Sequence, residues 1–194
     1  MLSYKESLKI LKETSALLEG HFILSSGLRS SHYIQCAKLL SYPKQAVAIC
    51  SSLAEKIREN LSKIDVILSP AIGGIVVGYE IGRQLNLETI FSERSNDKLI
   101  LRRGFDIKEN SNVLIVEDVI TTGKSAIECS DIVKSFKANV IGYACIIDRS
   151  GKNLVIKDKI ISQIKIDIPA FNPDQLPDNL KNIKPVKPGS RNIS

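Results

Sequence analysis

The stretch VLIVEDVITTGKSA, residues 113–126, decides the fold of this chain. Four apolar residues are followed by two acids, and a glycine-containing turn then leads into a helical pattern. An uninterrupted apolar run of this kind indicates a strand covered on both faces, as in a parallel sheet between layers of helices. The ending Gly123-Lys124-Ser125 is like that of a P-loop, but Asp118 stands where that motif requires its first glycine.

Patterns of the same two kinds alternate along the rest of the chain. Strands are expected at residues 65–70, 88–93, 113–118, 139–148 and 160–168, with a pair of strands around a Ser/Gly-rich turn within 21–40. Helices are expected at residues 3–18, where Gly20 stops the helix, and at 43–61, 73–85 and 122–136. This alternation predicts an α/β fold with a mainly parallel sheet flanked by helices.

The length of 194 residues suits a single domain, and the sequence contains no internal repeat. We divide the domain into an N-terminal helix with small hood strands (1–42), a core (43–168) and a C-terminal tail (169–194). The tail is rich in Pro and Asn, which is typical of a linker.

Composition and charge narrow the classes of function. Hydrophobic residues make up 43% and charged residues 25%, and no apolar run approaches the ~20 residues that span a bilayer. The N-terminus lacks the apolar core of a secretory signal, and four scattered cysteines with two histidines indicate neither a disulfide framework nor a zinc site. We therefore expect a cytoplasmic protein without membrane contact. The net charge of +6 favours an anionic partner, either nucleic acid or a phosphorylated small molecule, and an aromatic content of 5% argues against nucleic acid.

Three unusual loops follow expected strands, at residues 69–74, 117–124 and 148–151. In a parallel α/β sheet, ligands bind outside the carboxyl ends of the strands. We therefore expect these loops to lie along one edge of the sheet and to form the binding site together.

The second loop has groups that suit the two ends of a phosphorylated sugar. Backbone N–H groups at a helix N-terminus form a phosphate cradle, and the hydroxyls of Thr121, Thr122 and Ser125 add donors. The carboxylates of Glu117 and Asp118 accept hydrogen bonds from sugar hydroxyls. Both acids can address one ligand only if the chain leaves strand geometry between them, because successive side chains of a strand point to opposite faces. The predicted ligand is a ribose 5-phosphate; the alternative is that the acids only cap the helix.

This stretch resembles the PRPP-binding motif of the phosphoribosyltransferase family. It has an apolar strand, two acids, two further residues and then Thr-Thr-Gly. The resemblance implies that the acids hold the ribose hydroxyls of 5-phospho-α-D-ribose 1-diphosphate (PRPP) and that the turn holds its 5-phosphate. The implied PRPP-binding residues are Glu117, Asp118, Val119, Ile120, Thr121, Thr122, Gly123, Lys124 and Ser125.

Other segments resemble one branch of that family, the orotate phosphoribosyltransferases. These segments are residues 20–40, 91–105, 146–151 and 187–191. The resemblance implies that Arg149 grips the carboxylate of orotate and that Thr121 contacts orotate as well. An arginine fork suits a carboxylate, although Arg149 paired with Asp148 or solvated is the alternative. Tyr33 would pack against the pyrimidine ring or be an ordinary core aromatic.

The basic loop 93–104 carries four cations, Arg94, Lys98, Arg102 and Arg103. By the same resemblance, this loop is a mobile lid that neutralises the leaving diphosphate and reaches into the site of a neighbouring subunit, which implies a homodimer. The alternative is an exposed hairpin with a solvated basic face.

The chain departs from common family residues at Ser25, Ile34 and Ile72-Gly73, so lysine contacts at those places are in doubt. We expect the backbone N–H groups of Ala71, Gly73 and Gly74 to bind the diphosphate in their place.

The implied reaction transfers ribose 5-phosphate from PRPP to orotate, giving orotidine 5′-phosphate and diphosphate, in the biosynthesis of UMP. Mg²⁺ prefers substrate phosphates and few protein ligands, so we expect it to arrive with PRPP and to have no direct protein ligand. Orotate and PRPP are the expected partners, with no nucleic acid and no membrane. Two alternatives remain open: a phosphoribosyltransferase for a purine base, and a PRPP-sensing regulator on the same fold that binds nucleic acid.

Overall fold

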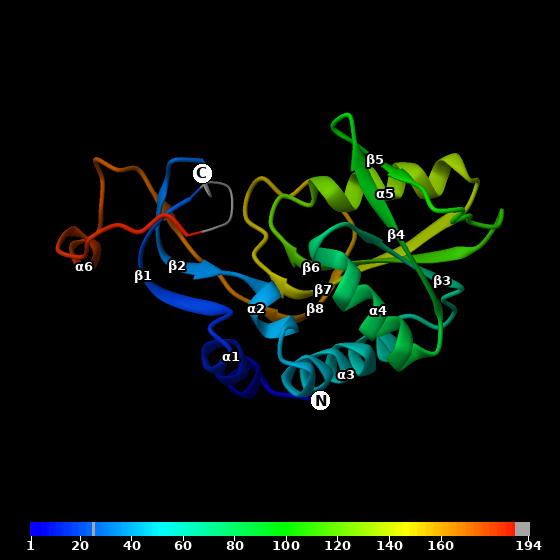
Figure 1. The fold of residues 1–194 in the computed structure, drawn as a ribbon, viewed down its shortest axis with the longest axis horizontal. Helices are drawn as coiled ribbons and strands as arrows, with labels where there is room; N and C mark the ends of the chain where they lie inside the picture. The colour runs from blue at the N-terminus through cyan, green and yellow to red at the C-terminus, as the bar shows by residue number, and fades with distance from the viewer. Residues whose placement is uncertain (25, 189–194) are drawn as a thin grey trace.

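The computed structural model describes residues 1–24 and 26–188. Its centre is a six-stranded sheet in the order β5-β4-β3-β6-β7-β8 (Figure 1). The strands are β3 (Val66–Pro70), β4 (Glu88–Ser95), β5 (Lys98–Leu101), β6 (Asn112–Ile120), β7 (Asn139–Asp148) and β8 (Ile160–Lys165). Neighbouring strands run parallel except β4 and β5, which form an antiparallel hairpin. The predicted α/β fold with a mainly parallel sheet is confirmed.

Helices cover both faces of this sheet, with α5 on one side and α3 and α4 on the other (Figure 1). The helices of the core are α3 (Pro43–Asn60), α4 (Gly73–Leu85) and α5 (Lys124–Ser135), and short α2 (Cys36–Leu40) precedes α3. Along β6, Val113 and Ile115 pack into the cluster under α5, whereas Leu114 and Val116 pack into the cluster with α3 and α4. The apolar run is therefore buried on both faces, which is why it lacks polar alternation.

A second, three-stranded sheet lies beside the core and forms the hood (Figure 1). It consists of β1 (Leu17–Ile23), β2 (Arg29–Ile34) and β9 (Ala170–Phe171), all antiparallel. The described part of the tail also contains α6 (Asp178–Lys181), and Val186 pairs with Phe22 of β1. The expectation of a linker-like tail is therefore wrong for residues 169–188, because β9 and Val186 pair with the hood strands β2 and β1.

The first helix is shorter than its apolar pattern predicts. Helix α1 (Tyr4–Glu13) begins at a capping box made by Ser3 and Glu6. It ends before Ser15, whose φ of 55° is left-handed. Leu17 and Leu18, which the pattern assigned to the helix, belong to β1. The expected stop at Gly20 is therefore wrong, since that glycine lies within the strand.

Three strand ends differ from the predicted ones. Strand β4 continues to residue 95 and does not stop at 93. Strand β6 continues to residue 120 and does not stop at 118, and β8 ends at 165 and not at 168. Helix α5 starts at Lys124, directly after Gly123 with φ 77°, and not near Thr122. Ser25, one of the departures from common family residues, lies outside the described residues. Residues 189–191, which end the segment 187–191 that resembles the orotate branch, also lie outside them. None of the described helices is both long and apolar enough to cross a membrane.

Candidate active site

Three loops meet at the carboxyl edge of the sheet. They follow β3, β6 and β7, which are parallel neighbours in the sheet, as the strand order requires for a shared site. Two backbone hydrogen bonds join the last two loops. Arg149 donates its N–H to Ile120 O at 2.8 Å, and Val155 donates its N–H to Thr122 O at 2.9 Å. The predicted base-binding arginine and the predicted phosphate turn therefore belong to one connected unit.

The turn between β6 and α5 has the geometry of an anion site. Thr121, Thr122 and Lys124 are exposed, and the N-cap residue is a glycine, which has no side chain to cap the helix. The Lys124 N–H makes only a long hydrogen bond of 3.4 Å to Thr122 Oγ1. A Cβ at Gly123 would lie 2.7 Å from Ile156 Cγ1, and its φ of 77° is also left-handed. Only glycine fits this position without strain. The uncapped N–H groups of the first helical turn remain available to a phosphate.

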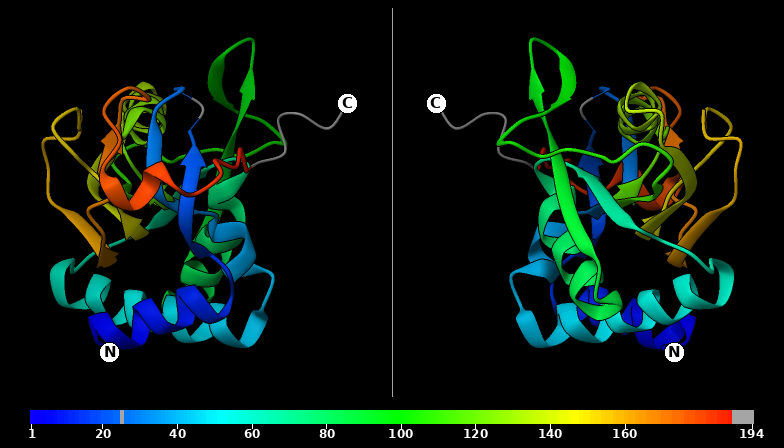
Figure 2. Two further views of the ribbon diagram at one scale, coloured as in Figure 1. Left: turned by 90° about the vertical axis from the view of Figure 1, so that its left-hand side faces the viewer. Right: turned by 90° about the vertical axis from the view of Figure 1, so that its right-hand side faces the viewer.

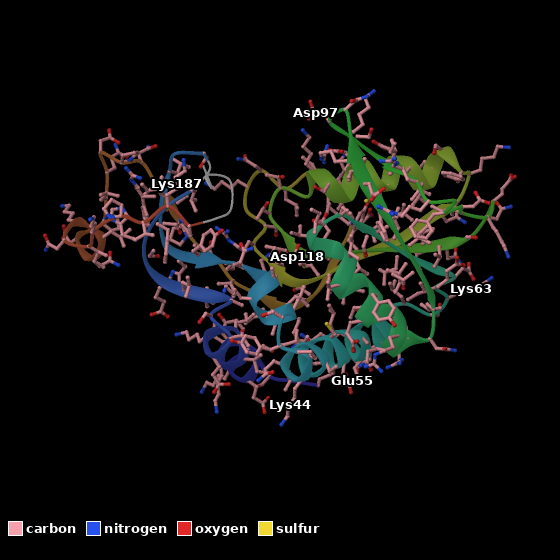
Figure 3. The ribbon with its side chains drawn as sticks, in the orientation of Figure 1. Lys44, Glu55, Lys63, Asp97, Asp118 and Lys187 are labelled. Carbon is pink, nitrogen blue, oxygen red and sulfur yellow. The ribbon has the colours of Figure 1, made fainter. Side chains whose placement is uncertain are left out.

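The two acids of the motif face opposite sides of the sheet. Glu117 points toward α5, where the backbone N–H of Ala126 reaches its carboxylate. Asp118 points toward the start of α4, because a Cβ at Gly73 would lie 2.8 Å from its Oδ1. The expectation that the chain leaves strand geometry between the acids is wrong, since β6 continues past both. Figure 3 shows Asp118 on the part of the core that lies nearest the hood.

Burial makes both carboxylates harder to ionise. Burial, with a smaller contribution from the charge of Asp118, raises the pKa of Glu117 to about 8. Burial also raises the pKa of Asp118, although the Val119 N–H donates to its Oδ1 at 2.9 Å and opposes the shift. Glu117 Oε1 is buried and has no hydrogen-bond partner among the described atoms. A donor from a ligand, such as a sugar hydroxyl, would satisfy this oxygen.

Arg149 is half-buried at the same edge, and its Nε has no partner among the described residues. Burial lowers the pKa of its guanidinium. The alternative of a pair with Asp148 does not hold, because Asp148 bonds to Lys165 Nζ (3.4 Å) and to the Ser150 N–H (2.7 Å). A half-buried arginine with an unsatisfied donor suits a planar anion such as a carboxylate.

The loop after β3 is only partly as expected. Helix α4 starts at Gly73 without a side-chain cap, so the N–H groups of Gly73 and Gly74 lie in its uncapped first turn. Ala71 donates its N–H to Ser92 O at 2.8 Å. The expectation that Ala71 offers this N–H to a diphosphate is therefore wrong. The Ile72 side chain is 86% exposed, and the Ala71–Ile72 peptide bond is cis.

The basic loop is the β4–β5 hairpin, whose tip projects beyond the rest of the molecule (Figure 2). Its tip is marked by Asp97 in Figure 3. Arg94 pairs with Glu128 of α5 at 3.1 Å, and Arg103 pairs with Glu93 at 2.6 Å. Arg102 lies 3.9 Å from the same Glu93 carboxylate, whereas Lys98 is exposed. The structure thus places the three arginines against acids of their own chain and does not bring the four cations to the turn after β6.

A groove of about 720 Å³ lies between this hairpin and α5. Its lining includes Lys98 and Lys124 but also three acids, Asp97, Glu128 and Asp131. The mixed charge makes the groove a weaker phosphate site than the uncapped turn before α5.

Sequence reasoning missed the segment that supports the phosphate turn. Leu154 and Ile156 pack against the place where Gly123 would carry a Cβ. The loop around them has no periodic pattern, so no signal in the sequence pointed to this role. Tyr33, expected near a ligand ring, packs beside Phe22 with ring centroids 5.8 Å apart, and its hydroxyl donates to Gln35.

Known proteins are similar to this chain over most of its length. Residues 40–175 match the family model described as "Phosphoribosyl transferase domain". An orotate phosphoribosyltransferase of Caldicellulosiruptor bescii is 46% identical over 184 residues, covering 95% of this chain and 96% of the relative. One of Methylorubrum populi is 47% identical over 188 residues, covering 96% of each.

Solved structures share the fold. The orotate phosphoribosyltransferase from Aeropyrum pernix superposes with a TM-score of 0.66 at 24% identity, covering 81% of this chain and 92% of that one. An adenine phosphoribosyltransferase from Thermoanaerobacter pseudethanolicus has a TM-score of 0.59 at 19% identity, covering 70% and 88%. With its apolar strand, paired acids and uncapped Thr-Thr-Gly turn, this chain belongs to the phosphoribosyltransferase family.

Proposed function

We propose that this chain is an orotate phosphoribosyltransferase, which transfers ribose 5-phosphate from PRPP to orotate in the biosynthesis of UMP. The products are orotidine 5′-phosphate and diphosphate. The observation that carries the proposal is Arg149, half-buried with an unsatisfied Nε and bonded through its backbone to the end of β6. The two orotate phosphoribosyltransferases that align with nearly the whole chain support orotate as the acceptor.

The donor would lie across the end of β6. The 5-phosphate accepts hydrogen bonds from the N–H groups at the start of α5 and from the exposed hydroxyls of Thr121 and Thr122. The ribose hydroxyls donate to Asp118, which faces the start of α4, whereas Glu117 faces α5 on the other side of the strand and does not share this ligand. The diphosphate then extends toward the uncapped start of α4, which Asp118 contacts.

The acceptor would lie between the donor and the turn after β7. Arg149 binds the orotate carboxylate in bidentate fashion, and the Thr121 hydroxyl contacts the same ring. This placement aligns a ring nitrogen of orotate with C1 of the ribose. Holding two reactants in this way contributes to the rate by positioning.

Stabilisation of the charges that develop in the transition state supplies the rest of the rate acceleration. The C1–O bond opens toward an oxocarbenium-like sugar as the nitrogen attacks, and negative charge collects on the leaving diphosphate. The Asp118 carboxylate lies beside the cationic sugar, and the hairpin cations are the lid that would neutralise the diphosphate.

Mg²⁺ suits this site as a partner of PRPP. The two carboxylates face opposite sides of β6, so they do not form a chelating pair for one ion. Mg²⁺ keeps several waters and prefers substrate phosphates, so PRPP oxygens would hold it, with Asp118 as the acid that faces the diphosphate side. Bound there, the ion neutralises part of the diphosphate charge.

A homodimer in the cytoplasm completes the proposal. Ile72, Val76 and Tyr79 are 86%, 51% and 66% exposed and follow one face of α4 from the diphosphate loop onward. A second copy packed on this stripe would bury it and bring its hairpin toward the neighbouring site. All four cysteines are free and buried, which suits a reducing compartment.

The direct test is the loss of orotate absorbance after addition of PRPP and Mg²⁺. Wild type consumes orotate, and Arg149→Ala raises KM for orotate by about 100-fold or more, because the carboxylate loses its charge-assisted partner. Arg149→Lys recovers only part of the loss, since a lysine cannot form the fork.

Arg58→Ala, which removes an exposed arginine at the end of α3, is the matched control and retains full activity. Turnover of adenine, hypoxanthine or xanthine in place of orotate would contradict the proposal. Specific binding of nucleic acid without turnover of any base would contradict it as well.

A further inference from the structure

The turn that follows β7 is held in shape by a buried carboxylate. Asp148, the last residue of β7, is only 5% exposed. Its Oδ1 accepts a hydrogen bond of 2.7 Å from the Ser150 N–H, which bends the chain around Arg149. On its other side, Arg149 donates its own N–H to Ile120 O at 2.8 Å. The backbone around Arg149 is therefore held by two hydrogen bonds. One is accepted by the Asp148 side chain and the other by the backbone of β6.

The second oxygen of Asp148 is also occupied. Its Oδ2 lies 3.4 Å from Nζ of Lys165, the last residue of β8, and Ile166, which follows the strand, donates its N–H to Asp148 O. A buried carboxylate next in sequence to an arginine would otherwise be its natural partner. Within the described part of the chain, Arg149 makes no ion pair with any acid. Both oxygens of Asp148 are used elsewhere, and the guanidinium stays available.

We propose that Asp148 is a positioning residue for substrate binding: its bond to the Ser150 N–H aims Arg149 at the anionic acceptor. Lys165 keeps that carboxylate from turning to the arginine. The inference rests on the proposed function, in which Arg149 holds the orotate carboxylate. Asp148 touches no substrate and acts only through the turn.

Two substitutions separate the shape of the turn from the charge. Asn at this position retains an oxygen that can accept the Ser150 N–H, whereas Ala removes both the acceptor and the charge. Lys165→Met leaves the turn intact but removes the cation that opposes an Asp148–Arg149 pair. Asp158→Ala is the matched control, because Asp158 is an exposed aspartate in the loop before β8.

The experiment measures KM for orotate, KM for PRPP and kcat for the full chain and these four variants. Asp148→Ala raises KM for orotate by about tenfold, since a buried charged hydrogen bond is lost, while KM for PRPP stays within about twofold. Asp148→Asn recovers KM for orotate to within about threefold of wild type, and Lys165→Met raises it by about threefold. The control matches wild type in all three constants.

The inference would be overturned if Asp148→Ala raised both KM values equally, or if Asn failed to recover the KM for orotate. A purely structural role would lower Tm and move both constants together. If Asp148→Ala does not fold, Lys165→Met decides, and a KM for orotate equal to that of wild type overturns the inference. A wild-type chain that consumes no orotate would overturn the proposed function itself, which separates the two failures.

Discussion

The carboxyl edge of the sheet and the β4–β5 hairpin differ in how their charges are satisfied. At the edge, Glu117 Oε1 and Arg149 Nε are buried without partners in the described chain. On the hairpin, Arg94 and Arg103 are exposed and already paired with Glu128 and Glu93. One region holds unsatisfied groups in a rigid frame, and the other holds satisfied groups on a projecting hairpin.

This difference indicates what each region contributes. Unsatisfied buried groups cost stability, and they are retained where a ligand completes their bonds. The edge is therefore set for binding before any substrate arrives. In the proposed lid, the hairpin arginines would have to exchange their acids for a diphosphate, so their contribution would begin only when the lid closes.

The largest effect is expected from Asp118. Asp118→Asn lowers kcat/KM by about 100-fold or more, the scale of one preorganised polar group at the reacting centre. Steady-state kinetics with PRPP and orotate measure it. Asp106→Asn, which changes an exposed aspartate after the hairpin, is the control and behaves as wild type. Unchanged activity in Asp118→Asn would remove the acids from the mechanism.

A pair of glycine variants compares the two regions directly. Gly123→Ala and Gly104→Ala both place an alanine at positive φ, 77° and 75°, but only the first meets a neighbour, Ile156 at 2.7 Å. Gly123→Ala should therefore raise KM for PRPP by about tenfold and lower Tm by several degrees more than Gly104→Ala. Equal changes in Tm would show that the turn before α5 is not rigidly packed.

The pH dependence of stability tests the unsatisfied acid. A carboxyl whose folded pKa is raised from the ordinary 4.5 to about 8 stabilises the fold fully only below pH 4.5, and this contribution is lost as pH rises toward 8. Glu117→Gln removes the dependence, so its Tm relative to wild type increases between pH 5 and pH 8.5. The corresponding gain in the free energy of unfolding of Glu117→Gln over wild type is at most about a few kcal/mol at pH 8.5. Thermal unfolding without ligands measures it, and a Tm difference that is constant with pH would contradict the buried, unpaired state.

The smallest effect is expected on the hairpin. Glu93→Gln frees Arg102 and Arg103 from their shared acid. Exposed ion pairs contribute about 0–1 kcal/mol, so Tm changes little, and kcat rises about twofold because the arginines are already free when diphosphate leaves. A tenfold change in either direction would mean that the hairpin is as preorganised as the edge.

The sequence predicted the fold and the meeting of three loops at one edge of the sheet, but not the orientation of the side chains there. The apolar run 113–116, buried on both faces, and the loops after parallel strands gave the sheet and its ligand edge. The opposite orientation of Glu117 and Asp118 was not predictable, because the length of β6 depends on pairing with β7 through Ile120. The hydrogen bond from the Ala71 N–H to Ser92 O likewise depends on a neighbouring strand, β4. Pairing across strands is tertiary information that local patterns lack.

The central claim is that the turn between β6 and α5 binds the ribose 5-phosphate. A crystal structure with PRPP, Mg²⁺ and a non-reactive orotate analogue tests this claim most directly. We expect the 5-phosphate on the N–H groups that follow Thr121, the ribose hydroxyls on Asp118, and the analogue carboxylate on Arg149. Donor density in the groove between β5 and α5, with the turn after β6 empty, would contradict the account.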